Sequence, residues 1–233
     1  MTNFNYSIDT SHGPMDGYIT AQPGQARPGI VLLPEIFGIN GAMRLAADQF
    51  SQAGFAVLAP DLFSQVESRV ELGYTEADRE RAIAIWQKMD DSVALADSRA
   101  AINALAADPR CNGEISVLGF CLGGKYALLL AAQGGILASV SFYPVRVNDY
   151  QEQLITLKCP TQVHVGDDDA HIPPPVLDVL TSALSSSETN ELHLYAGAGH
   201  GFFNSVRSFG YSPRAAESAF TRAVAFLNRH QGT

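Results

Sequence analysis

Short apolar runs alternate with amphipathic helical patterns along the chain, and this alternation restricts the fold more than any other feature. The runs are bounded by Gly, Pro or Asp, as is typical of buried strands. A β-α-β order predicts an α/β fold with a mostly parallel central sheet and helices on both faces. We expect strands near 18–21, 30–33, 56–59, 115–119, 139–143, 162–165 and 191–195, and helices near 42–53, 76–88, 91–107, 122–133, 174–184 and 213–229.

Length and composition favour one globular domain over residues 1–233. Hydrophobic residues make up 46% of the chain, enough for a sizeable core, and no repeat or linker divides it. The 24 acidic and 15 basic residues give a net charge of −9, which disfavours binding to nucleic acid. The N-terminus lacks the pattern of a secretory signal, and no apolar stretch approaches the ~18 residues of a membrane span. We therefore expect a cytoplasmic protein.

Cys121 stands between glycines where an expected strand meets an expected helix. The pattern is Gly119-x-Cys121-x-Gly123, followed by Gly124. Glycines there allow strand and helix to approach closely around one strained residue, as in a nucleophile elbow. A helix N-terminus favours the thiolate, and the backbone N–H of Leu122 would face a developing oxyanion. The alternative is a structural cysteine buried between strand and helix.

A thiol nucleophile needs a base, and the base needs an orienting group. His200 lies between two glycines in a loop after an expected strand, which predicts a catalytic base. Asp167, Asp168 and Asp169 follow the preceding expected strand, and spacing alone does not select one of them. The order cysteine, aspartate, histidine matches that of hydrolases with a nucleophile elbow. A solvated acidic turn is the alternative for the aspartates.

The expected strand 30–33 runs into Pro34-Glu35-Ile36-Phe37. A loop in this position supplies the second oxyanion N–H in hydrolases with a nucleophile elbow, here from Ile36. We expect the Glu35 carboxylate to exchange a proton with Cys121, and a surface glutamate is the alternative.

Four of the five other histidines have no expected part in catalysis. His164 and His193 alternate with apolar neighbours inside strands and are expected to be structural, whereas His12 and His230 are expected to be solvated. His171, close to the aspartates, is left open. No metal is expected, because HExxH, paired CxxC and calcium-loop spacings are missing from the sequence.

A partial phosphate-binding pattern overlaps the cysteine motif. Gly119-x-x-x-x-Gly124-Lys125 fits a P-loop, but Tyr126 stands where Ser or Thr would meet magnesium. Nucleotide binding is therefore the weaker alternative, and no cofactor is expected.

Several segments together resemble the dienelactone hydrolases (carboxymethylenebutenolidases). GFCLGG combined with PEIFG is quite specific, because ordinary esterases of this fold carry serine and lack that glutamate. The segments are 34–44 (PEIFGINGAMR), 79–90 (RERAIAIWQKMD), 117–128 (VLGFCLGGKYAL), 166–173 (GDDDAHIP) and 196–202 (AGAGHGF). The resemblance covers nearly the whole chain and implies the α/β-hydrolase fold.

The resemblance also implies roles for single residues. Cys121 is similar to the family nucleophile and His200 to its base, and the pattern Gly-x-x-Asp-x-x-(Ile/Val)-Pro selects Asp169 as the orienting group. Glu35 would hold the thiol protonated at rest and take up its proton when substrate displaces it. The implied reaction opens an unsaturated γ-lactone to a maleylacetate-type acid through an acyl-enzyme. Arg79 matches an arginine that pairs with the substrate carboxylate, or is a surface helix arginine.

The expected substrate-binding residues depart from the family pattern. Where the best-known members carry a second carboxylate-binding arginine, this chain has Asn204, and Arg207 is the candidate to replace it. Phe142 and Ile83 stand at positions where tyrosine is frequent, and Phe37 completes the set. This less polar set makes a larger or less acidic ester or lactone an alternative substrate.

Two alternatives to a dienelactone hydrolase stay open. One is a broad carboxylesterase, and the other is a non-catalytic ligand-binding protein that kept the fold. The expected partner is a small-molecule substrate, not nucleic acid or membrane, for a monomer or small homo-oligomer. The long polar segment 63–75 is a candidate lid.

Overall fold

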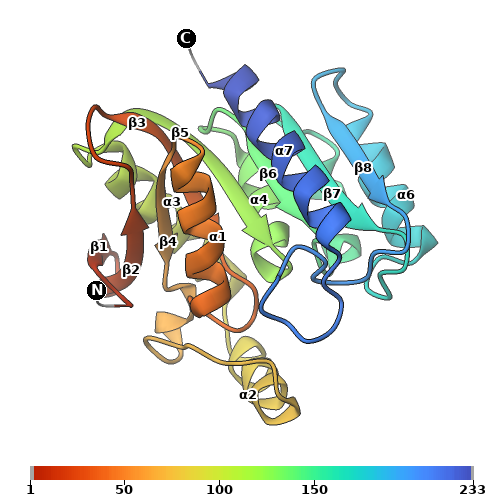
Figure 1. Ribbon diagram of the computed structural model, residues 1–233, viewed down its shortest axis with the longest axis horizontal. Helices are drawn as coiled ribbons and strands as arrows, with labels where there is room; N and C mark the ends of the chain where they lie inside the picture. Colours follow the sequence, from red (N-terminus) through yellow and green to blue (C-terminus); the bar gives the residue numbers. More distant parts are fainter. Residues whose placement is uncertain (1–2, 232–233) are drawn as a thin grey trace. The chain divides into compact units, whose positions relative to one another are not determined.

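The computed structural model describes residues 3–231, and the chain divides into two units, residues 1–115 and 116–233, which are described separately. Within each unit, helices pack against strands (Figure 1). This is the α/β architecture that the alternating sequence pattern predicts, so the expected fold class is confirmed.

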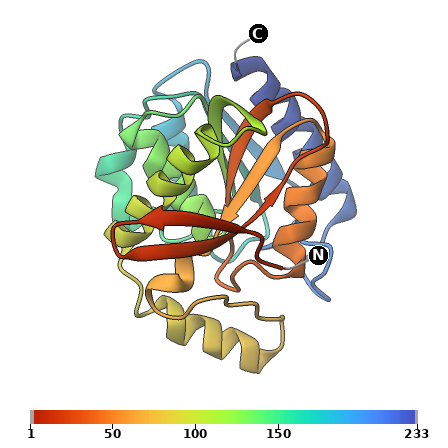
Figure 2. The ribbon, with the colours of Figure 1, turned by 90° about the vertical axis from the view of Figure 1, so that its left-hand side faces the viewer.

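In residues 1–115 the strand order is β1-β2-β4-β3. The pairs β1/β2 and β2/β4 are antiparallel, whereas β3 and β4 are parallel. Helices α1 and α3 cover opposite faces of these strands (Figure 2). The elements are β1 (Tyr6–Thr10), β2 (Gly13–Thr20), β3 (Arg27–Leu33), α1 (Gly41–Gln52), β4 (Ala56–Pro60), the 3₁₀ helix η1 (Leu62–Gln65), α2 (Glu76–Trp86) and α3 (Asp91–Ala106).

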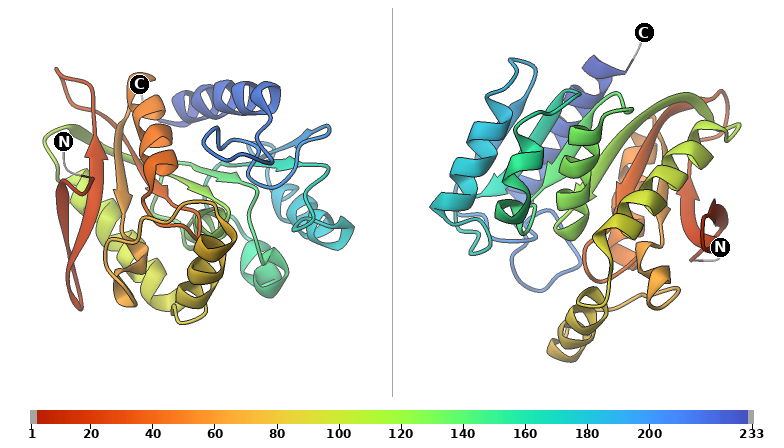
Figure 3. Two further views of the ribbon diagram at one scale, coloured as in Figure 1. Left: turned by 60° about the horizontal axis from the view of Figure 1, so that its bottom comes forward. Right: turned by 180° about the vertical axis from the view of Figure 1, so that it is seen from behind.

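In residues 116–233 the strand order is β5-β6-β7-β8, and all neighbours are parallel. Helices α4 and α6 lie on one face of these strands and α7 lies on the other (Figures 1 and 3). The elements are β5 (Cys111–Phe120, which begins in the first unit), α4 (Leu122–Gln133), β6 (Ser139–Phe142), the 3₁₀ helix η2 (Val147–Tyr150), α5 (Gln151–Leu154), β7 (Thr161–Gly166), α6 (Pro174–Leu184), β8 (Glu191–Tyr195) and α7 (Pro213–His230).

The parallel strands of the second unit end at one common edge. Phe120 in β5 is opposite Phe142 in β6, which in turn is opposite His164 in β7. Residues that directly follow these strands are therefore neighbours in space, although they are far apart in the sequence. Ligand sites of open α/β sheets lie at this edge.

The expected helices agree with the structure to within a few residues, and the expected break near Asp90 is present. The Asp90 carboxylate caps α3 by accepting the backbone N–H of Ser92 at 2.7 Å. Strand β1 was not expected, and β2 begins five residues before the expected 18–21 strand. Gly13 and Pro14 hide this start, because neither residue favours a strand. The short helix α5 was also not expected.

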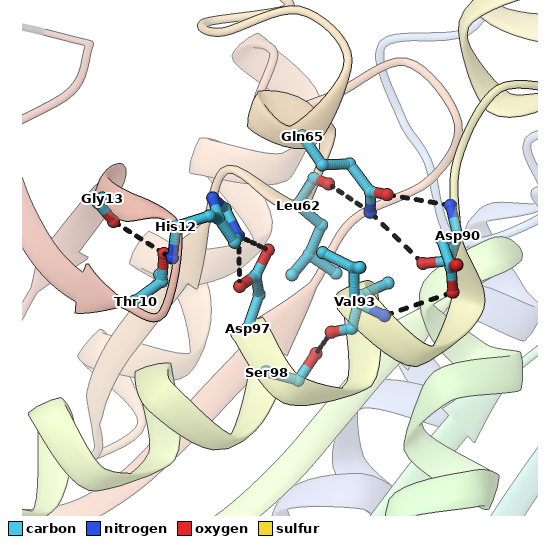
Figure 4. Close-up of polar contacts among 10 residues, drawn as sticks. Thr10, His12, Gly13, Leu62, Gln65, Asp90, Val93, Asp97 and Ser98 are labelled. Carbon is cyan, nitrogen blue, oxygen red and sulfur yellow. Dashed lines mark hydrogen bonds and ion pairs between the residues drawn. The ribbon is translucent and has the colours of Figure 1, made fainter.

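His12 is not simply solvated, so that expectation is wrong in part. Its Nε2 lies 2.8 Å from Oδ1 of Asp97, whose side chain is buried in α3, while the His12 side chain is 39% exposed (Figure 4). A buried carboxylate needs a partner, and the turn between β1 and β2 brings His12 onto α3 to provide one.

The segment after η1 is attached to the loop that follows β3. The Leu72 N–H donates to the Phe37 carbonyl at 3.0 Å, and the Asn40 amide donates to the Leu72 carbonyl at 2.8 Å. Gly38 allows this approach, because a Cβ there would lie 1.9 Å from the Val70 carbonyl oxygen. A lid role for residues 63–75 stays a prediction.

Within residues 3–231, every helix is too short or too polar to cross a bilayer.

Asp61, which precedes η1, is a fully buried carboxylate. Its Oδ2 accepts the Arg69 backbone N–H at 2.5 Å, which favours the ionised form. Burial opposes ionisation more strongly and raises the pKa of Asp61 to about 7.

We expect Asp61→Asn to change how stability depends on pH. An unfolded aspartate ionises near pH ~3.9, so between about pH 4 and 7 the unfolded chain loses a proton that the folded protein keeps. The free energy of unfolding therefore falls with rising pH in this window, by up to roughly 4 kcal/mol from this group. Urea denaturation should show Asp61→Asn gaining stability relative to the wild type from pH ~4 to ~8. A pH-independent difference would contradict this account.

Candidate active site

Cys121 occupies a strained turn between β5 and α4. Its φ is 55° and its ψ is −111°, a backbone conformation that residues other than glycine rarely adopt. The neighbouring glycines are sterically required: a Cβ at Gly119 would lie 2.0 Å from the carbonyl oxygen of Gly123, and one at Gly124 would lie 2.8 Å from that of Phe142. The strand-to-helix turn therefore has the form expected from the glycine spacing.

Hydrogen bonds fix this turn on both sides. The Cys121 N–H donates to the Phe142 carbonyl at 3.0 Å, and the Cys121 carbonyl accepts the Lys125 N–H at 3.2 Å. Leu122 is the first residue of α4. Backbone N–H groups in a first helical turn have no acceptor within their own helix. The Cys121 thiol and the backbone N–H donors of the first turn of α4 therefore lie next to each other.

Asp169 is the aspartate that contacts His200. Its Oδ2 lies 2.8 Å from Nδ1 of His200, and its Oδ1 accepts the His171 backbone N–H at 2.8 Å. The Asp169 side chain is fully buried, whereas Asp167 and Asp168 are exposed. Asp167 instead accepts the backbone N–H of Gly197, in the loop after β8, at 2.6 Å.

The loops after β7 and β8 approach each other through a glycine. A Cβ at Gly166 would lie 1.9 Å from the carbonyl oxygen of Ala198, so the second loop passes directly over the end of β7. The Asp168 N–H donates to the same carbonyl at 3.1 Å. This packing brings Asp169 and His200 together.

The protonation of His200 reflects its neighbours. Burial disfavours the imidazolium, but the negative charge of Cys121 and hydrogen bonds with Asp169 and Cys121 favour it, and together they raise the pKa of His200 to about 10. Cys121, His200 and Asp169 therefore form one connected polar group within residues 116–233. This group favours the protonated form of His200 beside the Cys121 side chain.

Two further rings contact the His200 imidazole, and neither was assigned a role from the sequence. The ring centroid of Tyr143 lies 5.1 Å away in a T-shaped arrangement, and that of His171 lies 4.5 Å away. Tyr143 is fully buried and has a φ of 38°, an uncommon value for a bulky residue. Only their positions in the sequence could have indicated these contacts. Both residues closely follow parallel strands, β6 and β7, that end at the same edge of the sheet.

Among the expected substrate-binding residues of this unit, two are fully or nearly buried. Phe142 is inaccessible and stacks on Phe120 and His164, with centroid distances of 4.8 and 4.6 Å. Asn204 is 4% exposed, and its side-chain oxygen accepts the backbone N–H of Val206 at 3.1 Å.

Arg207 lies beside the His200 backbone: one of its guanidinium nitrogens donates to the His200 carbonyl at 3.4 Å.

The other expected site residues belong to residues 1–115. Glu35 is 1% exposed, and its Oε2 accepts the Tyr74 hydroxyl at 3.4 Å. The Phe37 ring packs on the same tyrosine at 4.8 Å, and Ile36 is half-buried. Arg79 lies on the exposed surface of α2 in an ion pair with Glu76 at 3.3 Å. Roles for Glu35, Ile36, Phe37 and Arg79 in catalysis or binding stay predictions.

The position of Lys125 argues against the alternative of a nucleotide site, because this lysine would have to bind the phosphate. Lys125 is 2% exposed, and its ammonium lies over the rings of Tyr126 and Tyr150, at 4.5 and 5.2 Å. In the part of the chain that the structure describes, His, Cys, Asp and Glu form no group of three or more that would hold a metal ion.

Comparison with known proteins gives a consistent result. The model of the dienelactone hydrolase family matches residues 15–231. A carboxymethylenebutenolidase of Pseudomonas putida is 32% identical over 223 residues, which cover 95% of this chain and 94% of that protein. A Bradyrhizobium protein named, with the qualifier "probable", 2-oxo-3-(5-oxofuran-2-ylidene)propanoate lactonase is 32% identical and covers 87% of this chain and 84% of its own length.

Solved structures show the same fold. A Klebsiella pneumoniae protein, named provisionally as a dienelactone hydrolase, has a TM-score of 0.83 at 23% identity and covers 96% of each chain. The dienelactone hydrolase of Anabaena variabilis has a TM-score of 0.72 at 19% identity and covers 99% of this chain and all of its own.

We expect Cys121→Ala to lower the pKa of His200 from about 10. The substitution removes the thiolate charge and one hydrogen bond, so burial is opposed by Asp169 alone among these groups. Titration of histidine ring carbons by NMR measures the change. Cys159→Ala, at a buried cysteine elsewhere in the unit, is the matched control and should leave the titration unchanged. An unaltered His200 pKa in Cys121→Ala would mean that the thiol does not hold the imidazolium charge.

Proposed function

The chain belongs to the dienelactone hydrolase family, and we propose that it is a cysteine-dependent hydrolase that opens a small unsaturated lactone through an acyl-enzyme. The observation that carries the proposal is the connected group of Cys121, His200 and Asp169, with the thiol at a strained helix N-terminus. These are the parts of a nucleophile, a base and an orienting carboxylate. The family match spans residues 15–231, which supports the expectation of one domain over 1–233.

In the first step, Glu35 takes the proton of the Cys121 thiol as substrate arrives, and the resulting thiolate attacks the lactone carbonyl carbon. A carbon–sulfur bond forms, the ring carbon–oxygen bond breaks, and the ring oxygen leaves as an enolate. The His200 imidazolium supplies the proton that converts this enolate to the ketone. The Leu122 N–H stabilises negative charge on the carbonyl oxygen, as helix N-terminal donors do for oxyanions.

In the second step, neutral His200 takes a proton from water, and the resulting hydroxide attacks the thioester. The carbon–sulfur bond breaks, the acid is released, Glu35 returns its proton to the thiolate, and the imidazolium is restored. Asp169 holds the imidazole in one orientation throughout, because its Oδ2 accepts the Nδ1 proton. The cycle consumes one water and needs no cofactor.

The proposed substrate class is an unsaturated five-membered lactone with an acidic side chain. The names of the Pseudomonas putida and Bradyrhizobium relatives both describe such a ring carrying a carboxylate, although the side chains differ. The names of these two relatives, which are equally similar to this chain, give different lactones as substrates. Sequence identity at this level therefore supports a prediction of the lactone ring but not of its side chain.

A carboxylesterase with a less acidic substrate is the second candidate. It is favoured by Asn204, which stands where the best-known family members carry a carboxylate-binding arginine, and by Arg79, whose guanidinium pairs with Glu76 on an exposed helix surface. Comparing kcat/KM for cis-dienelactone, trans-dienelactone and p-nitrophenyl acetate separates the two candidates. Stoichiometric binding without product would instead support a non-catalytic protein.

We expect Cys121→Ala to reduce kcat/KM on the best substrate by roughly 10³-fold or more, because no other group can form the acyl-enzyme. Rapid quenching of the wild type should show an acyl adduct on the peptide that contains Cys121, by mass spectrometry. Cys159→Ala is the control and should keep wild-type turnover. Full activity in Cys121→Ala would rule out the mechanism.

We expect Glu35→Gln to lower kcat/KM by about 10²-fold, since the sequence assigns Glu35 to proton exchange with the thiol and such transfers typically contribute this much. Steady-state kinetics measures the effect, and thermal unfolding checks that the amide keeps the contact with the Tyr74 hydroxyl. A stable variant with wild-type kinetics would leave Glu35 a structural role only.

A further inference from the structure

Arg207 lies in the segment between His200 and α7, seven residues after the base. The sequence suggests that it replaces the arginine missing at Asn204 and binds the substrate carboxylate. The structure points elsewhere. We propose that Arg207 is a positioning residue for the backbone of His200 and not a carboxylate ligand, an inference that rests on the proposed function.

The guanidinium of Arg207 folds back onto its own loop. It donates to the His200 carbonyl at 3.4 Å, and its Cζ lies 4.6 Å from the centre of the Phe209 ring. A Cβ added to Gly201 would lie 1.9 Å from a guanidinium nitrogen. The planar group therefore lies between the bare backbone of Gly201 and an aromatic ring, as stacked arginines do.

The His200 carbonyl is approached from a second direction by the same segment. A Cβ at Gly210 would lie 2.8 Å from this oxygen, and the Ser212 N–H donates to the Phe202 carbonyl at 3.0 Å. The chain after the base thus turns back and packs against the peptide of His200. Arg207 connects the two ends of this turn, since it contacts both the His200 carbonyl and the Phe209 ring.

This contact controls the imidazole through the main chain. Asp169 fixes the ring at Nδ1, but the ring moves with its backbone, and Gly201, the next residue, has a φ of 79°. Glycine allows many other conformations once the guanidinium no longer covers it. Displacement of a catalytic group by about 1 Å can reduce the rate by up to ~10²-fold.

The two roles differ in how they depend on substrate charge. A carboxylate ligand lowers KM for an anionic substrate only, whereas a positioning residue raises kcat on anionic and neutral substrates alike. Methionine keeps the length of arginine without its charge, and lysine keeps the charge without the planar donor group.

The first experiment compares Arg207→Met and Arg207→Lys on an anionic dienelactone and on neutral p-nitrophenyl acetate. We expect Arg207→Met to lower kcat on both by roughly tenfold, with the ratio of the two kcat/KM values within about twofold of the wild type. Arg207→Lys should recover only part of the loss. A loss confined to the anionic lactone, full recovery with lysine, or no loss in Arg207→Met would each overturn the proposal.

The second experiment does not need turnover. Iodoacetamide and iodoacetate both alkylate thiolates, but only iodoacetate is anionic. We expect Arg207→Met to slow the alkylation of Cys121, followed by mass spectrometry of its peptide, by the same factor with both reagents, because the thiolate loses its positioned imidazolium. A selective loss with iodoacetate, or unchanged rates, overturns the proposal. If the wild type hydrolyses neither the dienelactone nor p-nitrophenyl acetate, the proposed function is contradicted. The alkylation rates then still test the positioning role of Arg207.

The matched control is Arg214→Met, at an exposed arginine in the first turn of α7, which should match the wild type in both experiments. Circular dichroism checks the fold of each variant. If Arg207→Met does not fold, Phe209→Ala removes the ring beneath the guanidinium at an exposed position, and the same criteria apply with a smaller expected effect.

Discussion

A buried imidazole gives up its proton unless negative charge lies beside it, and the site depends on how this requirement is met at His200. The Asp169 carboxylate, itself removed from water, provides one partner and the Cys121 side chain another. Their combined effect outweighs burial and favours the protonated form of His200. His200 therefore depends on both neighbours to keep its proton.

The fold satisfies this requirement by ending four parallel strands at one edge. Each strand end contributes one part: the thiol after β5, a supporting ring after β6, the carboxylate after β7 and the imidazole after β8. Backbone must pass very close to backbone at these ends, and Gly119 and Gly166 are the positions where a side chain would prevent it. The glycines are therefore as necessary to the site as the polar groups are.

The sequence was sufficient for the parts that have local signatures. The glycine spacing around Cys121 and the order of aspartate and histidine predicted the group of three, although the choice of Asp169 needed the family resemblance. Contacts between distant segments had no such signature. The contact of the Tyr143 ring with His200 depends on a strained backbone, and that of Arg207 depends on a loop that turns back on itself, so neither contact could be predicted from residue type. Strand β1 was missed because it is short and carries a single buried residue, Ile8.

The backbone conformation of Cys121 has a consequence for protein engineering. An L-residue held at a φ of 55° and a ψ of −111° stores conformational energy, typically ~1–3 kcal/mol, that glycine would not. Selection for thermal stability alone would therefore tend to replace Cys121, the proposed nucleophile, with glycine and yield a stable protein without its proposed activity. A stabilisation campaign on this chain should score activity and melting temperature together, because at this position the two objectives oppose each other.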